Sequence, residues 1–378
     1  MRARTSAVVD LTWSQVHAFR VQRHHLARRA PKKDLAKVVG AMGGAQAQLM
    51  SAAELQIAVR VDCAVSDVRT ALWKDRTLVK TWLMRGTLHL VPSADLPLFT
   101  AAMRTKWMKP RNAWLKFFGM TEQDAIEFAD AIGSALTATP MSREELIAAV
   151  SKGRSRRLRE WLRSGWGGLL KPAARRGQLC FGPSRGASVT FVRPAKWLPS
   201  WRELDPDEAL LEVARRYLRA YGPATKSDFA RWWGPSFPGA GAAAWSGLAS
   251  ELAPVSVDGV RADVLARDLD VLARIKSEPS VQLLPAFDPY VMGHKSRDHL
   301  FERVHTRKVS RIAGWISAVV LADGRVSGTW THVVANGILR ILVERFGPLS
   351  PKVRSAIGLR ADSLAESIGA ARATVKFA

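Results

Sequence analysis

Three stretches of the sequence repeat one order of expected elements: two or three amphipathic helices, then a short strand, a turn and a second strand. In the first stretch the hairpin covers residues 77–92, where apolar and polar residues alternate around Arg85 and stop at Pro92. The second stretch begins with a capping box, Ser142 followed by Glu145. Helices followed by a small hairpin are typical of a winged helix, so the sequence predicts three such units in tandem.

The pattern changes after about residue 278, where β-like segments predominate and Asp323–Gly324 predicts a tight turn. Helical spacing returns in the tail, residues 350–375. We therefore expect an α+β fold with three tandem winged-helix (helix-turn-helix) units and a β-rich C-terminal part that forms a small barrel or an open sheet. The expected boundaries of these four parts are 1–100, 101–200, 201–277 and 278–378.

Positive charge is the strongest feature of the composition. The chain has 57 Lys and Arg residues against 33 Asp and Glu, a formal net charge of +24, so its natural partner is a polyanion. Three helix-turn-helix units with this charge favour double-stranded DNA. An anionic membrane would also attract the chain, but no amphipathic segment is long or apolar enough to favour it. With no signal-peptide core and no membrane-span window, we expect a cytoplasmic, nucleoid-associated protein.

The sequence contains few residues in a spacing that could bind a metal or a cofactor. Cys63 and Cys180 are far apart and lack a Cys or His neighbour at metal-ligand spacing, so we expect two buried thiols and no zinc site. The eight His residues form no HExxH motif. The scattered Asp and Glu residues offer no carboxylate cluster for a metal-dependent nuclease. We expect neither a metal nor a cofactor.

The segment GAMGGAQAQLM, residues 40–50, contains the best candidates for chemistry. Gly43 and Gly44 lower helix propensity, so the preceding helix should end there and leave the next residues extended. On a helix, Gln46 and Gln48 would point to nearly opposite sides. In an extended segment both amides project from one face, about 7 Å apart at the backbone, and can converge on one small target. By itself, however, a Gln-x-Gln pair is most often an exposed polar segment.

Gln46, Ala47 and Gln48 resemble the Gln–apolar–Gln catalytic motif of the AlkZ-like family, winged-helix DNA glycosylases that unhook interstrand crosslinks. Three more segments resemble family segments, and with the motif they span most of the chain: TWLMRGTLHLVP, LLKPAARRGQLCFGPSRG and LLPAFDPYVMGHKSR. The third motif residue is Gln, as in the crosslink-unhooking branch, whereas the YcaQ-like branch has Asp there.

The resemblance implies tandem winged helices in a C-shape, and hydrolysis of the N-glycosidic bond of alkylated purines, including bulky and crosslinked N7 or N3 adducts, in duplex DNA. Two neutral amides can suffice, because an N7-alkylated purine is already cationic and a good leaving group. We assign Gln48 to the attacking water and Gln46 to the water or the deoxyribose, and the sequence leaves open whether these roles are exchanged.

No neighbouring Lys is an evident Schiff-base nucleophile, so the enzyme should be monofunctional and leave an abasic site. A C-shaped monomer can already embrace the duplex, and a monomer is therefore expected. The family further implies self-resistance to a DNA-alkylating natural product.

A bulky or crosslinked lesion suits an open, positively charged cleft better than an enclosed base pocket. Our candidates for phosphate or groove contacts are Arg85, Lys171, Arg185, His294, Lys295 and Arg297. For each of them the alternative is an ordinary solvated surface charge. Trp166 is a candidate for stacking on DNA. Asp288, beside Pro289, is expected to cap a turn and not to act as a catalytic acid.

A non-catalytic winged-helix protein, such as a transcriptional regulator, would also explain the charge and the repeated units. It would not explain the paired Gln residues behind a helix-breaking Gly-Gly. The sequence also shows neither an effector pocket nor a dimerising helix. The DNA glycosylase is therefore the preferred hypothesis.

Overall fold

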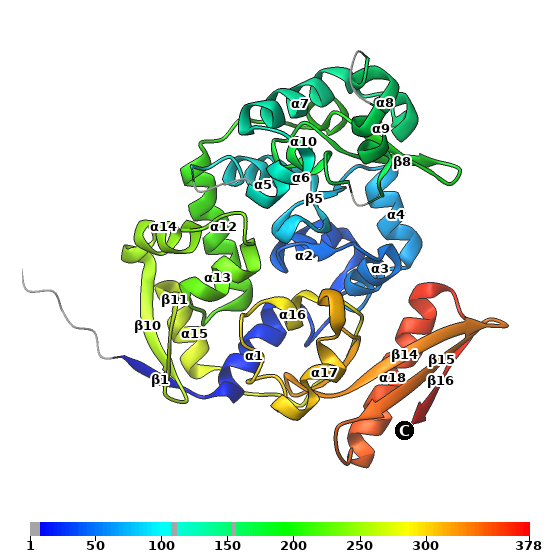
Figure 1. Ribbon diagram of the computed structural model, residues 1–378. Coiled ribbons are helices and arrows are strands. Elements are labelled where there is room, and N and C mark those ends of the chain that lie inside the picture. Colours follow the sequence, from blue (N-terminus) through cyan, green and yellow to red (C-terminus); the bar gives the residue numbers. More distant parts are fainter. Residues whose placement is uncertain (1–7, 107–111, 153–155, 166) are drawn as a thin grey trace, which may run out of the picture.

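The computed structural model describes residues 8–106, 112–152, 156–165 and 167–378. Helices and strands are interspersed along these segments in the mixed α+β fold that the sequence predicts, and the strands form five small sheets. Figure 1 shows the sheets distributed over the molecule and not joined into one. Within the described segments, no helix combines the length and the hydropathy needed to cross a membrane.

The first region packs three helices against a three-stranded antiparallel sheet. The helices are α2 (Leu35–Ala41), α3 (Met50–Ala58) and α4 (Val65–Trp73), and the strands are β3 (Ala45–Gln46), β5 (Leu78–Trp82) and β6 (Leu88–Pro92). Because β6 lies between β5 and β3, the predicted hairpin is present and β3 is added at its edge. A two-stranded parallel pair, β2 (Ala30–Pro31) and β4 (Val61–Asp62), lies beside this core.

The second region is mainly helical and contains one small sheet. Its elements are α5 (Leu96–Ala102), α6 (Asn112–Phe118), α7 (Glu122–Ala135), β7 (Met141–Ser142), α8 (Arg143–Val150), α9 (Arg156–Arg163), α10 (Lys171–Arg175), β8 (Cys180–Arg185), β9 (Ser188–Val192) and α11 (Pro194–Trp197). Ser142 begins α8 with the predicted capping box, since its hydroxyl accepts from the Glu145 backbone and Glu145 accepts in return.

The third region includes the N-terminal segment of the chain. Its elements are α12 (Pro206–Tyr221), α13 (Lys226–Trp233), α14 (Ala240–Gly247), β10 (Leu252–Val257), β11 (Val260–Leu265) and α15 (Leu269–Arg274). Strand β1 (Val9–Leu11) pairs in parallel with β10, and helix α1 (Trp13–Arg23) packs Val16 and Phe19 into the same core. The expected boundaries assign this segment to the first unit, and all four boundaries stay predictions.

The C-terminal part is an open five-stranded sheet covered by a long helix. Its elements are β12 (Val281–Leu284), α16 (Pro289–Met292), α17 (Thr306–Val309), β13 (Val319–Ala322), β14 (Arg325–Ala335), β15 (Ile338–Arg345), α18 (Pro351–Ile368) and β16 (Arg372–Phe377). The strands follow the order β12-β13-β14-β15-β16. The predicted turn at Asp323–Gly324 joins β13 to β14. The tail is helical only to Ile368, because Gly369 adopts a positive φ of 76° and the chain returns as β16.

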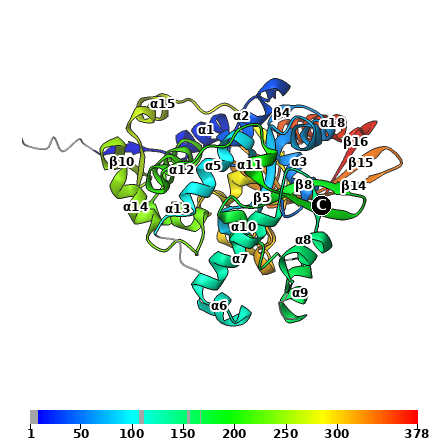
Figure 2. The same cartoon turned by 90° about the horizontal axis from the view of Figure 1, so that it is seen from above.

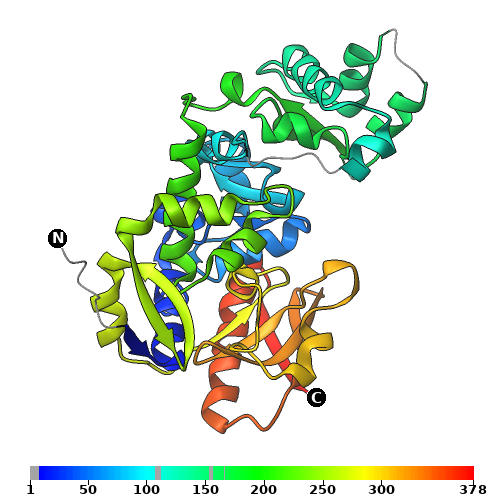
Figure 3. The ribbon, with the colours of Figure 1, turned by 60° about the vertical axis from the view of Figure 1, so that its left-hand side comes forward.

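The four parts form a C-shape. Figure 3 shows the second region and the C-terminal sheet at opposite ends, with the first and third regions between them. Helix α12 lies in the middle, and its Tyr217 and Leu218 share one core with Val79 of the first region and Met103 just after α5. Seen from above in Figure 2, α6 and α9 project on one side of the molecule, while α1, α2 and α15 lie on the other.

Candidate active site

The two candidate Gln residues follow a helix that two glycines end. Gly43 and Gly44 have φ values of +74° and +96°, a conformation that only glycine adopts without strain. The chain is then extended as predicted: Gln46 pairs with His89 of β6, and the Ala47 N–H donates to the Leu88 carbonyl at 2.7 Å.

The two amides differ in exposure. Gln46 is buried, at 5% exposure. Gln48 is exposed and lies at a bend just before α3. One amide is thus fixed within the fold, and the other is open to solvent.

Arg85 lies beside Gln46 and holds its side chain. It occupies the hairpin between β5 and β6, where it adopts φ +57° within the 3-10 turn η2 (Met84–Gly86). Its guanidinium donates to Gln46 Oε1 at 3.1 Å and to the Trp232 carbonyl at 2.7 Å. Burial lowers the pKa of Arg85 to about 10, so the side chain stays charged at neutral pH. The predicted DNA contact at Arg85 is therefore half-buried and already engaged with Gln46.

The space next to Gln46 is too small for a nucleobase. Aromatic and apolar side chains, including Tyr221, Trp232 and Phe287, line a cavity of about 10 Å³ there, which holds no more than one water molecule. This cavity therefore cannot enclose a base, and the expected open cleft stays a prediction.

A larger, basic cavity begins on the other side of Arg85. It has a volume of about 450 Å³ and is lined by one carboxylate, Glu122, and by five basic side chains: Arg85, Arg104, Lys171, Arg175 and Arg176. Two of these are paired within the chain, Arg104 with Glu203 at 2.8 Å and Arg176 with Asp130 at 3.3 Å.

The other three basic side chains of this cavity have no ion-pair partner among the described residues. Among the described residues, no carboxylate lies within ion-pair distance of Arg85, Lys171 or Arg175. Burial lowers the pKa of both Lys171 and Arg175. The cavity, which we call the basic cleft, therefore has charge available for an anion such as a DNA phosphate.

The other predicted DNA contacts lie in different surroundings. Arg185 is exposed on the hairpin of β8 and β9, and it pairs with Glu145 at 2.5 Å, which lowers the pKa of Glu145 to about 2. His294 is buried at 8% exposure and bonded to Arg20 at 2.8 Å, a position that does not favour a DNA contact. Burial lowers its pKa to about 3.

Lys295 and Arg297 follow His294 on the same segment. Lys295 is exposed, and Arg297 is half-buried with its guanidinium on the Val291 carbonyl at 2.8 Å. Arg297 and the exposed Arg231 of α13 are close enough to Arg85 to contribute to its lowered pKa. The sequence analysis did not predict Arg231 and Arg175, because nothing in the sequence distinguishes them from the other Lys and Arg residues, 57 in all. Trp166 lies outside the described residues.

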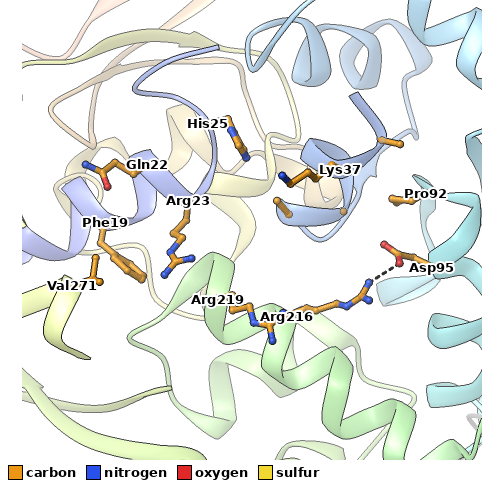
Figure 4. Close-up of a pocket in the computed structure, with 13 residues that line it drawn as sticks. Phe19, Gln22, Arg23, His25, Lys37, Pro92, Asp95, Arg216, Arg219 and Val271 are labelled. Carbon is orange, nitrogen blue, oxygen red and sulfur yellow. Dashed lines mark ion pairs between the residues drawn. The ribbon is translucent and has the colours of Figure 1, made fainter. Parts of the chain in front are cut away.

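A cavity larger than the basic cleft lies elsewhere and shares no lining residue with that cleft or with the space at Gln46. Its volume is about 720 Å³, and α1, α2 and α12 surround it (Figure 4). Two of its arginines are paired, Arg216 with Asp95 at 2.8 Å and Arg23 with Asp268 at 2.5 Å. Much of its charge is therefore compensated, and we do not assign the chemistry to it.

Three further groups have structural surroundings. Asp288 caps α16 as predicted, since its side chain accepts from the Tyr290 N–H at 3.0 Å. Cys63 and Cys180 are free and buried, as predicted, and burial raises the pKa of Cys63 to about 11. In the part of the chain that the structure describes, no group of three or more His, Cys, Asp or Glu side chains is placed to hold a metal ion.

Comparisons with known proteins agree on one family. Residues 39–367 match the family model described as DNA glycosylase AlkZ-like. The chain is 39% identical over 330 residues to the interstrand DNA cross-link repair glycosylase of Streptomyces sahachiroi, a match that covers 85% of this chain and 88% of the relative. The solved structure of Streptomyces sahachiroi DNA glycosylase AlkZ superposes with a TM-score of 0.88 at 34% identity, over 98% of this chain and all of that one. The chain belongs to the AlkZ-like DNA glycosylases, enzymes that hydrolyse N-glycosidic bonds.

Proposed function

We propose that this glycosylase excises N7- or N3-alkylated purines, including those crosslinked between strands, from duplex DNA, and that Gln46 and Gln48 are its catalytic residues. The observation that carries the proposal is the position of these amides: Gln46 is buried beside a cavity too small for a base and bonds to Arg85, which also lines the basic cleft, while Gln48 is exposed two residues further on. The similar Streptomyces protein is named for cross-link repair, which supports the same substrate class here.

The chemistry requires little acid–base assistance. The water oxygen forms a bond to C1′ of the deoxyribose while the C1′–N9 bond breaks, and the electron pair of that bond neutralises the cationic purine. The surplus proton of the water passes to solvent. Amide groups that orient the water and meet the charge developing on sugar and base lower the barrier of such a reaction.

The shape of the site suits a lesion that cannot be flipped into an enclosed pocket. A purine tethered to the opposite strand carries its tether with it. An exposed Gln48 can reach C1′ of such a purine without the protein surrounding the base. Lys171 and Arg175 in the basic cleft and Arg231 and Arg297 beside Arg85 would hold the phosphates around the lesion.

The proposal has several finer parts, one of which is argued from the lining of the site. No lysine lines the cavity at Gln46 within the described residues, which supports a monofunctional enzyme that leaves an abasic site. We further propose a monomer that acts on chromosomal DNA and protects its host against a DNA-alkylating natural product. Deleting the gene should then sensitise the host to that compound.

A single-turnover assay tests the proposed function. The substrate is an end-labelled duplex with one N7-alkylguanine, and hot alkali converts each abasic site into a strand break. The wild type should produce breaks, and Gln46→Ala and Gln48→Ala should each be about 100- to 1,000-fold slower. Gln123→Ala is the matched control, because Gln123 is exposed on α7 and bonds only to Glu127 among the described residues.

Two results would contradict the proposal. A Gln48→Ala variant with the wild-type rate would show that the chemistry lies elsewhere. Tight binding by the wild type without any product would support a non-catalytic DNA-binding protein.

A further inference from the structure

The hydrogen bonds around Gln46 allow only one orientation of its amide. A guanidinium has donors and no acceptor, so the contact between Arg85 and Gln46 at 3.1 Å forms only when Oε1 faces Arg85. The amide nitrogen Nε2 then points away from the guanidinium. Among the described residues none accepts a hydrogen bond from Nε2. The Gln46 backbone is held as well, because Gln56 donates to its carbonyl at 3.2 Å.

His89 fixes the same arrangement from the neighbouring strand. Burial and the charge of Arg85 lower the pKa of His89 to about 3, so its ring is neutral. Its Nδ1 lies 3.0 Å from the Thr87 carbonyl, which can only accept, and so Nδ1 carries the proton. Nε2 of His89 is left as an acceptor for Arg85 at 3.4 Å. His89 Nε2 and Gln46 Oε1 therefore each accept from the same guanidinium nitrogen, Nη2, whose two protons both find a partner.

Arg85 is costly to keep in this position. A positive φ of 57° is rare for a residue with a side chain. The buried Nε has no partner, and no carboxylate of the described residues compensates the charge. Gly234 packs so closely against the turn that a Cβ at Gly234 would lie 2.9 Å from the backbone nitrogen of Arg85. A half-buried guanidinium in a strained turn, without a carboxylate partner among the described residues, does not stabilise a fold, and functional sites are where such strain is found.

We propose that Arg85 is a positioning residue that makes Gln46 a hydrogen-bond donor to the departing purine and leaves Gln48 to accept from the attacking water. This inference rests on the proposed function, because it divides the roles of the two amides. Gln46 Oε1 accepts from the charged guanidinium of Arg85. This hydrogen bond also polarises the amide and strengthens Nε2–H as a donor. The purine receives the electron pair of the C1′–N9 bond, so a donor to its ring gains strength as the bond breaks. Gln48 is exposed, and no described residue bonds to its side chain, so its amide carbonyl can accept from the water.

The first test is a double-mutant cycle on the single-turnover rate at saturating DNA. Arg85→Gly keeps the turn, since glycine favours positive φ, and it should lower the rate about 10- to 100-fold. If Arg85 acts through Gln46, the same change in a Gln46→Ala background should have no further effect. Arg76→Gly is the matched control: Arg76 also has a positive φ, of 54°, but its guanidinium lies on Trp197. That control should keep the wild-type rate.

Added methylguanidinium should partly restore the rate of Arg85→Gly, because the basic cleft gives access to the vacated position. The same ionic strength of sodium chloride should not restore it. A merely structural defect of Arg85→Gly would lower the melting temperature, and methylguanidinium would not restore its rate. The Gln46→Ala, Arg85→Gly double variant is the control and should not respond to methylguanidinium.

The second test exchanges the amides for carboxylates, which only accept hydrogen bonds. Gln46→Glu keeps the bond to Arg85 but loses the donor, so it should be as slow as Gln46→Ala. Gln48→Glu keeps an acceptor for the water and should lose no more than about tenfold. The reverse order of rates would overturn the division of roles.

The outcomes separate the two proposals. Full activity in both Gln→Ala variants would refute the proposed catalytic site. If the Gln→Ala variants are slow but Arg85→Gly has the wild-type rate, the catalytic site stands and the role of Arg85 is refuted. The same holds if Arg85→Gly lowers the rate by the same factor in the Gln46→Ala background as in the wild type.

Discussion

Arg60 and Asp288 form a fully buried ion pair that joins the first region to the C-terminal part. Both side chains are 0% exposed, and two parallel hydrogen bonds of 2.7 and 2.8 Å connect them. Arg60 also donates to the Gln56 carbonyl, and Gln56 in turn holds the Gln46 backbone. Through Gln56 the pair thereby supports the backbone of the proposed catalytic segment, although neither residue contacts Gln46 itself in these hydrogen bonds.

We expect Asp288→Asn to reduce the free energy of unfolding by about 3–5 kcal/mol, because it leaves the charge of Arg60 buried without a partner. Urea denaturation measures the change. Asp62→Asn serves as the control, since Asp62 is 80% exposed in its ion pair with Arg29 and should change stability by less than about 0.5 kcal/mol. A wild-type midpoint for Asp288→Asn would contradict this assignment.

Individual residues were predictable from sequence where a local pattern marks them, and contacts were not. The Gly-Gly break predicted the extended segment that contains Gln46 and Gln48, whose catalytic role stays a prediction from the family resemblance, and the alternating segment placed Arg85 in a turn. The hydrogen bond between Arg85 and Gln46 depends on the pairing of β3 with β6, which no local pattern reveals. The burial of His294 likewise depends on Arg20, which approaches from a helix 274 residues away.

At the scale of elements, the break between α2 and β3 controls the position of the segment that contains Gln46 and Gln48. Gly44 has a positive φ, and a Cβ on it would lie 2.9 Å from Val91 Cγ1 and 3.1 Å from the Leu90 carbonyl oxygen. Both contacts belong to β6, the strand on which β3 pairs. Any side chain at this position would push β3 away from its partner.

Gly44→Ala should therefore lower the free energy of unfolding by about 1–3 kcal/mol and slow excision as well, because Gln46 would shift relative to Arg85. Thermal unfolding and the single-turnover rate are the two measurements. Gly259→Ala is matched in conformation, with φ +84°, but a Cβ there meets no described atom within 4 Å beyond its chain neighbours. It should show a smaller loss of stability and an unchanged rate. Equal excision rates for the two variants would count against the proposal that the position of β3 determines where Gln46 lies.

Elements fixed by short-range signals were predicted well. The capping box of α8, the β5–β6 hairpin and the turn at Asp323–Gly324 all follow from neighbouring residues. The pairing of β1 with β10 joins residues nearly 250 positions apart, and sequence periodicity cannot show it. The end of α18 at Gly369 was missed because helical spacing continues formally to residue 375, while strand β15 offers an edge for β16.

On the scale of the whole molecule, the C-shape brings charge from three regions to one site. Gln46 and Arg85 come from the first region, Lys171 and Arg175 from the second, and Arg231 from the third. The net charge of +24 predicts a polyanion partner without predicting this convergence. The fold class was accessible from patterning and resemblance, whereas the convergence follows only from tertiary packing.

Stability should fall as the pH is lowered from 7.5 to 5.5. Burial lowers the pKa of His17, His89 and His294 from 6.5 to about 3. It also lowers the pKa of His24 well below 6.5. The unfolded chain binds protons on them near pH 6.5 and the folded chain does not, so the stabilisation present above pH 6.5 is lost progressively toward pH 3. Each group should cost about 1.4 kcal/mol at pH 5.5. Calorimetry should show a lower melting temperature at pH 5.5, and an unchanged one would contradict the burial of neutral rings.

The most direct test of the account is an unhooking assay on a duplex with one N7–N7 guanine interstrand crosslink, resolved on a denaturing gel under single-turnover conditions. The wild type should convert the slow crosslinked species into separate strands that carry an alkali-labile abasic site. The Gln46→Ala, Gln48→Ala double variant should bind the same duplex and unhook it at least about 100-fold more slowly. If the double variant matched the wild type, or if the wild type left the crosslink intact, the account of an open, two-amide active site would be wrong.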